Sequence, residues 1–341
     1  MTATAILDFR SDTVTLPDPV MCAAMGRAEL GDDVLDGDPT MRRLEERAAT
    51  VLGTEAALWV PSGSMGNLIA LFLQVRRGER LLAPAQAHVL DQEVGTAFWL
   101  AGATPGPLPW RTGAPGRPAP DAVRTAAAST GPYFALRTTG LCLENTHNAA
   151  GGTVTTVDEH DALIRTATDA GLWVHLDGAR IWNAAVRLGV APARLTRGVT
   201  TVQACLSKGL GAPVGSVLGG SVALIAEARR ARKMLGGGIR QGGMLAAAGL
   251  VALDRIARLR TDHETARVLA SGLCELGWDV DVPETNVVMC RVENPDEVVR
   301  RLGARGLLTV PVVGRVRWMT HSGVDRAAVG EALGRLAQVP T

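Results

Sequence analysis

Lysine is almost absent from this 341-residue chain. Lys208 and Lys233 are its two lysines, and arginine supplies every other permanently basic side chain. A guanidinium stays charged and is not nucleophilic, whereas an amine held among apolar neighbours has a lowered pKa and can condense with an aldehyde. Lys208 lies between an apolar run, residues 202–206, and a glycine-rich turn, so it is either a Schiff-base lysine or a strand-end lysine that extends into solvent.

Cysteine is also scarce, and its spacing excludes two kinds of site. No two cysteines form a C-x-x-C pair, so neither a disulfide framework nor a zinc site is expected, and buried reduced thiols are favoured. The five cysteines are Cys22, Cys142, Cys205, Cys274 and Cys290.

Long apolar runs and basic tracts are missing as well. An acid and an arginine come too early for a signal peptide, and no apolar run approaches the length of a membrane span. The net charge is +1, which gives no electrostatic reason to bind nucleic acid or anionic membranes. We therefore expect a cytoplasmic protein without a nucleic-acid or membrane partner.

The composition that remains is that of a globular enzyme, with 47% hydrophobic and 20% charged residues. A chain of this length is expected to split into a larger and a smaller domain. We predict an N-terminal arm at 1–18, a large domain at 19–260 and a small α+β domain at 261–341. A long helix that ends near Leu259 is predicted to join the two domains.

Alternating elements predict an α/β fold for the large domain. The order of strand, helix and strand through 140–177, followed by the strand before Lys208, indicates parallel βαβ units. Asp177 and Lys208 should then meet at the carboxyl edge of one sheet. The expected helices are 18–29, a helix capped by Thr40 that runs to 52, 68–75, 121–128, 157–170 and 223–233; the expected strands are 56–60, 81–83, 140–143 and 172–176; residues 102–120 are expected to be a surface connection.

Three polar segments near strand ends carry candidate chemistry. The turn 61–67 between a strand and a helix can bind a phosphate through backbone N–H groups and the helix dipole, although an ordinary capped turn has the same pattern. It matches neither the Walker nor the dinucleotide-binding glycine pattern. His88 follows a strand and is either a ligand-facing residue or a structural hydrogen bonder. Asp177 is a candidate site residue, and a structural salt bridge with Arg180 is the alternative.

The acid-rich loop 31–40 suggests calcium at first sight. Its acids lack the EF-hand spacing and the terminal glutamate, so no metal site is predicted. A phosphate turn, an aspartate, a lysine and a histidine on one sheet edge instead match the needs of pyridoxal 5′-phosphate (PLP). Lys208 would form the Schiff base, and Asp177 would keep the pyridine nitrogen protonated.

Motifs along nearly the whole chain are similar to those of the L-threonine aldolases (low-specificity or L-allo-threonine aldolase type). These are fold type I PLP enzymes of the β-eliminating lyase superfamily. The resemblance implies a PLP-dependent transferase-like fold, with a mostly parallel sheet flanked by helices and a smaller C-terminal α+β domain. The matching motifs are RSDTVT (10–15), GDDV (31–34), PSGSMGN (61–67), ENTHN (144–148), HLDGAR (175–180), LSKG (206–209), RKMLGGG (232–238), and VR (316–317) before TH (320–321).

The resemblance also implies residue roles. Lys208 would be the Schiff-base lysine, Asp177 the partner of the pyridine nitrogen, and His88 the residue stacked on the ring and the first candidate for the base. The phosphate would lie against Gly63, Ser64 and Ser207, and the substrate carboxylate against Ser11, Arg180 and Arg317. Lys233 and Arg240 would reach in from a neighbouring subunit of a homodimer or of a tetramer made of two dimers.

The implied reaction is retro-aldol cleavage of L-threonine, L-allo-threonine or a related β-hydroxy-α-amino acid to glycine and an aldehyde. Such a lyase would take part in threonine catabolism and glycine biosynthesis. Two positions depart from the family pattern: Leu35 replaces a tyrosine, and Tyr133 stands where many members have a histidine presumed to contact the β-hydroxyl. Two alternatives remain, namely a β-eliminating lyase or dehydratase on the same scaffold and a PLP-binding protein without catalysis.

Overall fold

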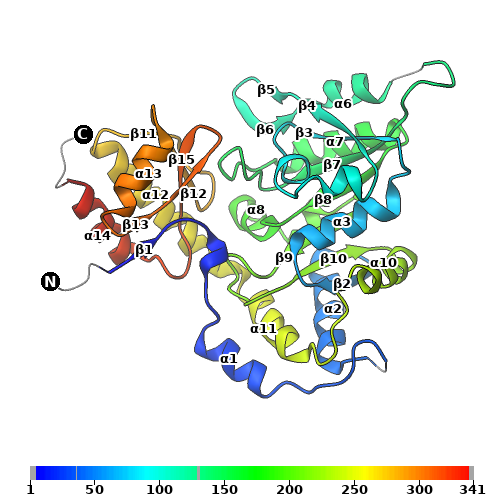
Figure 1. The fold of residues 1–341 in the computed structure, drawn as a ribbon, viewed down its shortest axis with the longest axis horizontal. Coiled ribbons are helices and arrows are strands. Elements are labelled where there is room, and N and C mark those ends of the chain that lie inside the picture. Colours follow the sequence, from blue (N-terminus) through cyan, green and yellow to red (C-terminus); the bar gives the residue numbers. More distant parts are fainter. Residues whose placement is uncertain (1–4, 36, 129–130, 338–341) are drawn as a thin grey trace.

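The computed structural model describes residues 5–35, 37–128 and 131–337 of the chain. Figure 1 shows a large body on one side and a smaller body on the other, with β1 (Leu7–Asp8) and α14 (Arg326–Ala337) both at the smaller body. Each body has its own hydrophobic core, one built from residues 21–259 and the other from Phe9 together with residues 266–332. The predicted fold class is confirmed.

A seven-stranded sheet forms the centre of the large body, and helices flank it (Figure 1). Four of its neighbouring strand pairs are parallel, whereas β10 runs antiparallel to both of its neighbours. The sheet is therefore mostly parallel, as predicted. In spatial order its strands are β2 (Ala56–Val60), β10 (Ser216–Gly220), β9 (Thr201–Cys205), β8 (Trp173–Asp177), β7 (Thr138–Glu144), β3 (Arg80–Pro84) and β4 (Thr104–Leu108).

The three central strands β7, β8 and β9 bring the candidate site together. Glu144 of β7 pairs with Asp177 of β8, and Asp177 pairs in turn with Gln203 of β9. These strands are buried almost throughout, which suits parallel strands covered on both faces. Their carboxyl ends meet at one edge, so the polar residues that follow them converge there.

The prediction that 102–120 is a surface connection is wrong. This segment contains β4, the outer strand of the central sheet, and a two-stranded hairpin of β5 (Trp110–Arg111) and β6 (Ala114–Pro118). Prolines are tolerated in β4 because an edge strand leaves N–H groups unpaired on its outer side. Gly106 is needed there because a Cβ would lie 2.8 Å from Leu82 Cδ2.

Several helix ends differ from the sequence prediction. Asp38, not Thr40, caps α2 by accepting a hydrogen bond from the Met41 N–H. The helix expected at 68–75 begins five residues earlier, at Gly63. The long helix expected to reach Leu259 instead ends at Leu253. The helices of the large body are α1 (Pro19–Gly26), α2 (Pro39–Leu52), α3 (Gly63–Gln74), α4 (His88–Asp91), α5 (Thr96–Trp99), α6 (Pro120–Ala127), α7 (Val157–Asp169), α8 (Ile181–Leu188), α9 (Pro192–Leu195), α10 (Val222–Met234) and α11 (Gly243–Leu253).

The smaller body packs three helices against a four-stranded antiparallel sheet. Strand β1 (Leu7–Asp8) of the N-terminal segment pairs with β13 (Leu307–Leu308), and Phe9 meets Trp318 edge to face with ring centroids 5.2 Å apart. The start of α12 belongs to the first core and its middle to the second, and the domain boundary at 260 stays a prediction. The remaining elements are α12 (Leu259–Glu275), β11 (Asp279–Val280), β12 (Val287–Arg291), α13 (Pro295–Gly303), β14 (Val310–Val312), β15 (Arg315–Met319) and α14 (Arg326–Ala337).

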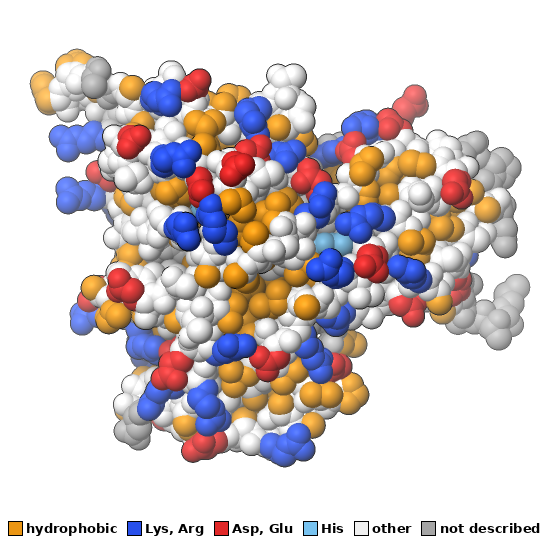
Figure 2. Space-filling model, turned by 180° about the vertical axis from the view of Figure 1, so that it is seen from behind, with side chains coloured by type: hydrophobic (Ala, Val, Ile, Leu, Met, Phe, Trp, Pro, Cys, Tyr) orange, Lys and Arg blue, Asp and Glu red, His pale blue; other side chains and the backbone are white. Residues whose placement is uncertain are grey.

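The surface shows no concentration of one charge on the face drawn in Figure 2. Blue and red side chains are intermixed there, and hydrophobic side chains gather in the middle of the face. Among the described residues, no helix combines the length and the apolar character that a membrane crossing requires.

Candidate active site

A cavity of about 230 Å³ lies at the carboxyl edge of the central sheet. Six of the residues predicted from the sequence line it together. Most of the other lining residues come from the same turns and strand ends, whereas Glu93 follows α4. The six are Gly63, Ser64, His88, Asp177, Ser207 and Lys208.

The first turn of α3 forms one wall of this cavity. Ser62 caps the helix by accepting a hydrogen bond from the Met65 N–H, and Gly63 and Ser64 begin the helix. The N-terminus of a helix offers unpaired N–H groups and a partial positive charge to an anion. A Cβ on Gly63 would lie 2.8 Å from the Cys205 sulfur, so glycine lets this turn rest directly on β9. The turn is therefore suited to a phosphate.

Asp177, the last residue of β8, is 2% exposed. Its Oδ1 accepts a hydrogen bond from the Ala179 N–H (3.0 Å), and its Oδ2 accepts one from the Asn67 amide (2.9 Å). No arginine pairs with it in the described part of the chain: Arg180 pairs with Asp12 instead, which rules out the Asp177–Arg180 salt bridge considered as an alternative. A buried carboxylate at a cavity wall can hold a protonated ring nitrogen.

His88 begins α4 and is hydrogen-bonded to Glu93. His88 Nδ1 lies 2.8 Å from Glu93 Oε1, which also accepts from the Asn67 amide. Burial works to lower the pKa of His88, but the hydrogen bond to Glu93 and the charges of Asp177, Glu93 and Glu144 raise it overall. Burial and the charge of Asp177 raise the pKa of Glu93. Both directions favour the protonated form of the group concerned.

The same three side chains have the composition of a cation site, because one ligand atom from each of His88, Glu93 and Asp177 lies within 4.8 Å of the others. Their hydrogen bonds already occupy these atoms. The Asn67 amide joins the two carboxylates, and the imidazole faces Glu93. The arrangement is thus complete as a hydrogen-bonded network.

Lys208 follows β9 and supplies the amine of the cavity. Its backbone oxygen accepts a hydrogen bond from the Thr15 hydroxyl, which ties the turn to the N-terminal segment. Within the described part of the chain, its ammonium group has no hydrogen-bond or ion-pair partner at contact distance. An unpaired amine in a walled cavity is available for condensation with an aldehyde.

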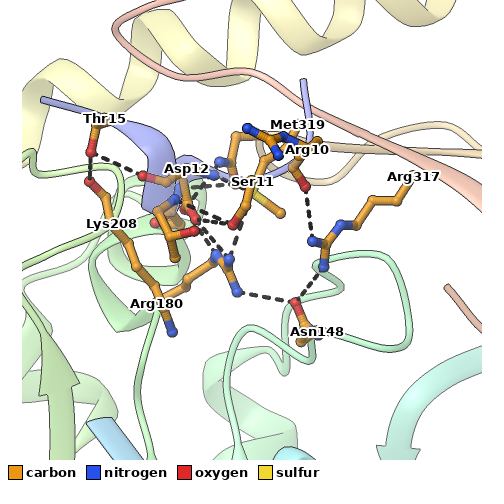
Figure 3. A network of polar contacts seen from close by, with 12 residues as sticks. Arg10, Ser11, Asp12, Thr15, Asn148, Arg180, Lys208, Arg317 and Met319 are labelled. Carbon is orange, nitrogen blue, oxygen red and sulfur yellow. Dashed lines mark hydrogen bonds and ion pairs between the residues drawn. The ribbon is translucent and has the colours of Figure 1, made fainter. Parts of the chain in front are cut away.

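The predicted carboxylate-binding residues lie beside this cavity and are shown in Figure 3. Arg180 donates from Nε and Nη2 to Asp12 (2.9 and 2.7 Å), and both partners are buried. Burial alone would raise the pKa of Asp12, but Arg180, and then Lys208 and Arg317, hold it at about 2. Ser11 lies next to Asp12 and caps the short helix Asp12–Val14. The structure thus places Ser11, Arg180 and Arg317 in one network.

Three predicted site residues lie away from the cavity of their own chain. Tyr133 is 97% exposed, Lys233 lines a separate surface cavity, and Arg240 pairs with Asp32. The first departure position, Leu35, is 75% exposed. None of them lines the cavity described above.

The three acids that the structure describes in the loop that suggested calcium have protein partners. Asp32 pairs with Arg240, Asp33 pairs with Arg232, and Asp38 caps α2. This loop therefore serves to fix the segment around residue 240 against α2.

Some residues of the network received no role from the sequence. Asn67 and Asp12 stood inside matched motifs, so a polar residue in an otherwise structural motif was the available signal. Glu93 had no such signal, because its importance comes from its approach to His88 in the folded chain. Asn148 also stood in a matched motif, and its contact with two arginines appears only in the structure.

Comparison with known proteins identifies the family. The model of the beta-eliminating lyase family matches residues 8–295. The chain belongs to the beta-eliminating lyase family. This family member is 41% identical over 327 residues to the probable low-specificity L-threonine aldolase 2 of Arabidopsis thaliana, covering 92% of each chain. It is 40% identical over 329 residues to the low specificity L-threonine aldolase of Escherichia coli K12, covering 96% of this chain and 97% of the relative.

Solved structures show the same fold for this family member. The Leishmania major threonine aldolase matches with a TM-score of 0.81 at 19% identity, covering 97% of this chain and 98% of the other. The Sphingomonas wittichii serine palmitoyltransferase matches with a TM-score of 0.75 at 16% identity, covering 98% and 86%. At these sequence identities the structural similarity shows the fold alone.

The residues present fit PLP. The cavity offers unpaired helix N–H groups for a phosphate, a buried carboxylate for a ring nitrogen, and the Lys208 amine, which no described residue contacts by a hydrogen bond or an ion pair. Each feature sits on a different wall, and each matches one chemical group of the cofactor.

Proposed function

We propose that this protein is a PLP-dependent aldolase that cleaves L-threonine, L-allo-threonine and related β-hydroxy-α-amino acids to glycine and an aldehyde. The observation that carries the proposal is the single cavity that Lys208, Asp177, His88 and the first turn of α3 share. The relatives named as low-specificity L-threonine aldolases, about 40% identical over nearly full length, support the reaction type.

Lys208 would hold the cofactor as a Schiff base, with Asp177 on its ring nitrogen and Gly63, Ser64 and Ser207 around its phosphate. When bound, the cofactor supplies an electron sink for the electron pair released at Cα as the Cα–Cβ bond breaks. The protein must then orient the substrate, move one proton from the β-hydroxyl and return one to Cα.

The arginines beside the cavity would orient the substrate. A carboxylate bound by guanidinium groups has a fixed orientation, since the planar set of N–H donors can bind it in only a few geometries. Ser11, Arg180 and Arg317 would hold the substrate carboxylate and thereby set which bond at Cα is aligned for cleavage.

His88 is our candidate for the group that takes the β-hydroxyl proton. Its Nδ1 is engaged by Glu93, while its Nε2 has no partner among the described residues. The hydrogen bond to Glu93 fixes the ring, and the raised pKa makes the neutral imidazole a stronger base.

We propose that Lys233 and Arg240 act in the site of a second subunit, because they lie outside the cavity of their own chain. Tyr133 would likewise contact the substrate β-hydroxyl in the site of a second subunit. Exposed apolar side chains offer a surface for such pairing; Leu16, Val20, Leu30 and Met244 are 82%, 55%, 47% and 44% exposed. The assembly would be a homodimer or a pair of dimers.

The test is to incubate the purified holoprotein with L-threonine, L-allo-threonine and phenylserine and to measure aldehyde and glycine. We expect both products in equal amounts, and Lys208→Ala should abolish them together with the absorbance of the Schiff base between the protein and the cofactor. Ammonia and a keto acid in place of glycine would show an eliminating lyase or dehydratase instead. Cofactor binding without any product would show a binding protein without catalysis.

A further inference from the structure

Arg180 and Arg317 share one hydrogen-bond acceptor. Arg180 follows β8 of the large body, whereas Arg317 belongs to β15 of the small one. Their Nη1 atoms lie 3.1 and 3.0 Å from Asn148 Oδ1, and Figure 3 shows the two side chains reaching this atom from two sides. We propose that Asn148 is the positioning residue of the carboxylate site: its neutral amide oxygen fixes both guanidiniums and leaves their positive charge for the substrate.

The N–H groups of the two arginines are not equally free. A guanidinium has five N–H donors. Arg180 gives Nε and Nη2 to Asp12 and Nη1 to Asn148, so most of its donors are engaged. Arg317 gives Nη1 to Asn148 and Nη2 to the Arg10 backbone oxygen (2.9 Å), and its buried Nε has no partner among the residues that the structure describes. Arg180 therefore anchors Asn148, while Arg317 keeps donors for a ligand.

The charge at position 148 decides whether a carboxylate is attracted. Arg180 and Arg317 carry +2 together and Asp12 carries −1, which leaves +1 in the network. Burial, and then the nearby charge of Arg180, lower the pKa of Arg317 to about 10, so it remains charged at neutral pH. An aspartate at 148 would cancel the remaining charge, whereas the amide accepts both hydrogen bonds without doing so.

The position of Asn148 is also fixed relative to that of His88. Its backbone N–H donates to Glu144 Oε1, and the His88 N–H donates to Glu144 Oε2, both at 2.7 Å. One buried carboxylate thus fixes the spacing between the carboxylate site and the candidate base. The adjoining Ala149 backbone oxygen accepts from Arg315 of the small body, so Asn148 links both bodies at the cavity.

The inference rests on the proposed function for its substrate, but its test measures binding. Calorimetric titration of the holoprotein with glycine and with glycinamide, which keeps the amine but lacks the carboxylate, separates the two contributions. Asn148→Asp should weaken glycine binding at least about tenfold and change glycinamide binding less than about twofold. Asn148→Ala should weaken glycine selectively too, because the two like charges lose their shared acceptor. Asn294→Asp, an exposed N-cap of α13, adds the same charge as a control and should change neither.

For turnover of L-threonine, Asn148→Asp should raise KM more than it lowers kcat. If the Asn148 variants bound glycine and glycinamide equally more weakly, Asn148 would only support its loop, and the proposal would be overturned. The same holds if both variants had equally lowered melting temperatures and showed no selective loss of glycine binding. Unchanged glycine binding in both variants would also overturn the proposal. If the parent releases no aldehyde but Asn148→Asp still weakens glycine binding more than glycinamide binding, the proposed function fails while the assignment of Asn148 stands.

Discussion

Replacing Asp12 by asparagine should destabilise the fold strongly, although the two side chains have nearly the same shape. Asp12 is 0% exposed, and Arg180 beside it is 6% exposed. The variant leaves a buried guanidinium without its counter-charge, which costs about 3 kcal/mol even though the amide oxygen still accepts one hydrogen bond. The lowering of the Asp12 pKa from 3.8 to about 2 corresponds independently to about 2 kcal/mol.

Urea denaturation in saturating cofactor measures this loss, and Asp8→Asn is the matched control. Asp8 also pairs with an arginine, but Arg10 is 48% exposed, so that pair contributes less than about 1 kcal/mol. Because the folded-state pKa of Asp12 is depressed, its stabilisation is complete above pH 3.8 and is lost as the pH falls towards 2. The difference in the free energy of unfolding between the parent and Asp12→Asn should therefore become smaller over that pH range. Equal losses for the two variants at pH 7 would refute the reasoning.

Three further predictions concern other parts of the chain. Glu93→Gln should move the acid limb of kcat/KM to lower pH, because it removes the carboxylate charge that helps to raise the pKa of His88 and leaves only a neutral amide oxygen as the hydrogen-bond acceptor; an unmoved limb would exclude His88 as the base. Burial lowers the pKa of His175 from 6.5 to about 4, so the parent should lose up to about 3 kcal/mol of stability as the pH falls from 6.5 to 4, and His175→Gln should lose correspondingly less in denaturation curves. Gly140→Ala should cost about 1–3 kcal/mol in the same assay, since its Cβ would lie 2.2 Å from Trp173 Cζ2, whereas Gly26→Ala, with open space around it, should be tolerated.

The parallel part of the sheet could be predicted because its strands are apolar runs that end in polar residues. Strands β4 and β10 could not. The sequence Thr-Pro-Gly-Pro-Leu of β4 resembles a loop, and the glycines of β10 resemble a turn. They are strands because of their neighbours: a Cβ on Gly219 would lie 2.8 Å from the Thr54 hydroxyl, so this glycine allows close packing.

The candidate site was predictable where its residues directly follow strands. Asp177, Lys208 and the turn after β2 meet because parallel strands end at one edge. The residues that hold the site arginines in place do so through tertiary contacts between positions far apart in the sequence. Asp12 pairs with Arg180 across 168 positions, and Asn148 meets Arg317 across 169. No local pattern encodes such partners, so the sequence identified the arginines but not what holds them.

The attachment point of the cofactor tests the central claim most directly, and two lysines make the outcome unambiguous. The holoprotein is reduced with borohydride, digested and sequenced by mass spectrometry. The account predicts a pyridoxyl group on the peptide that contains Lys208 and none on the peptide that contains Lys233. Label on Lys233, or no label on a protein that binds the cofactor, would contradict it.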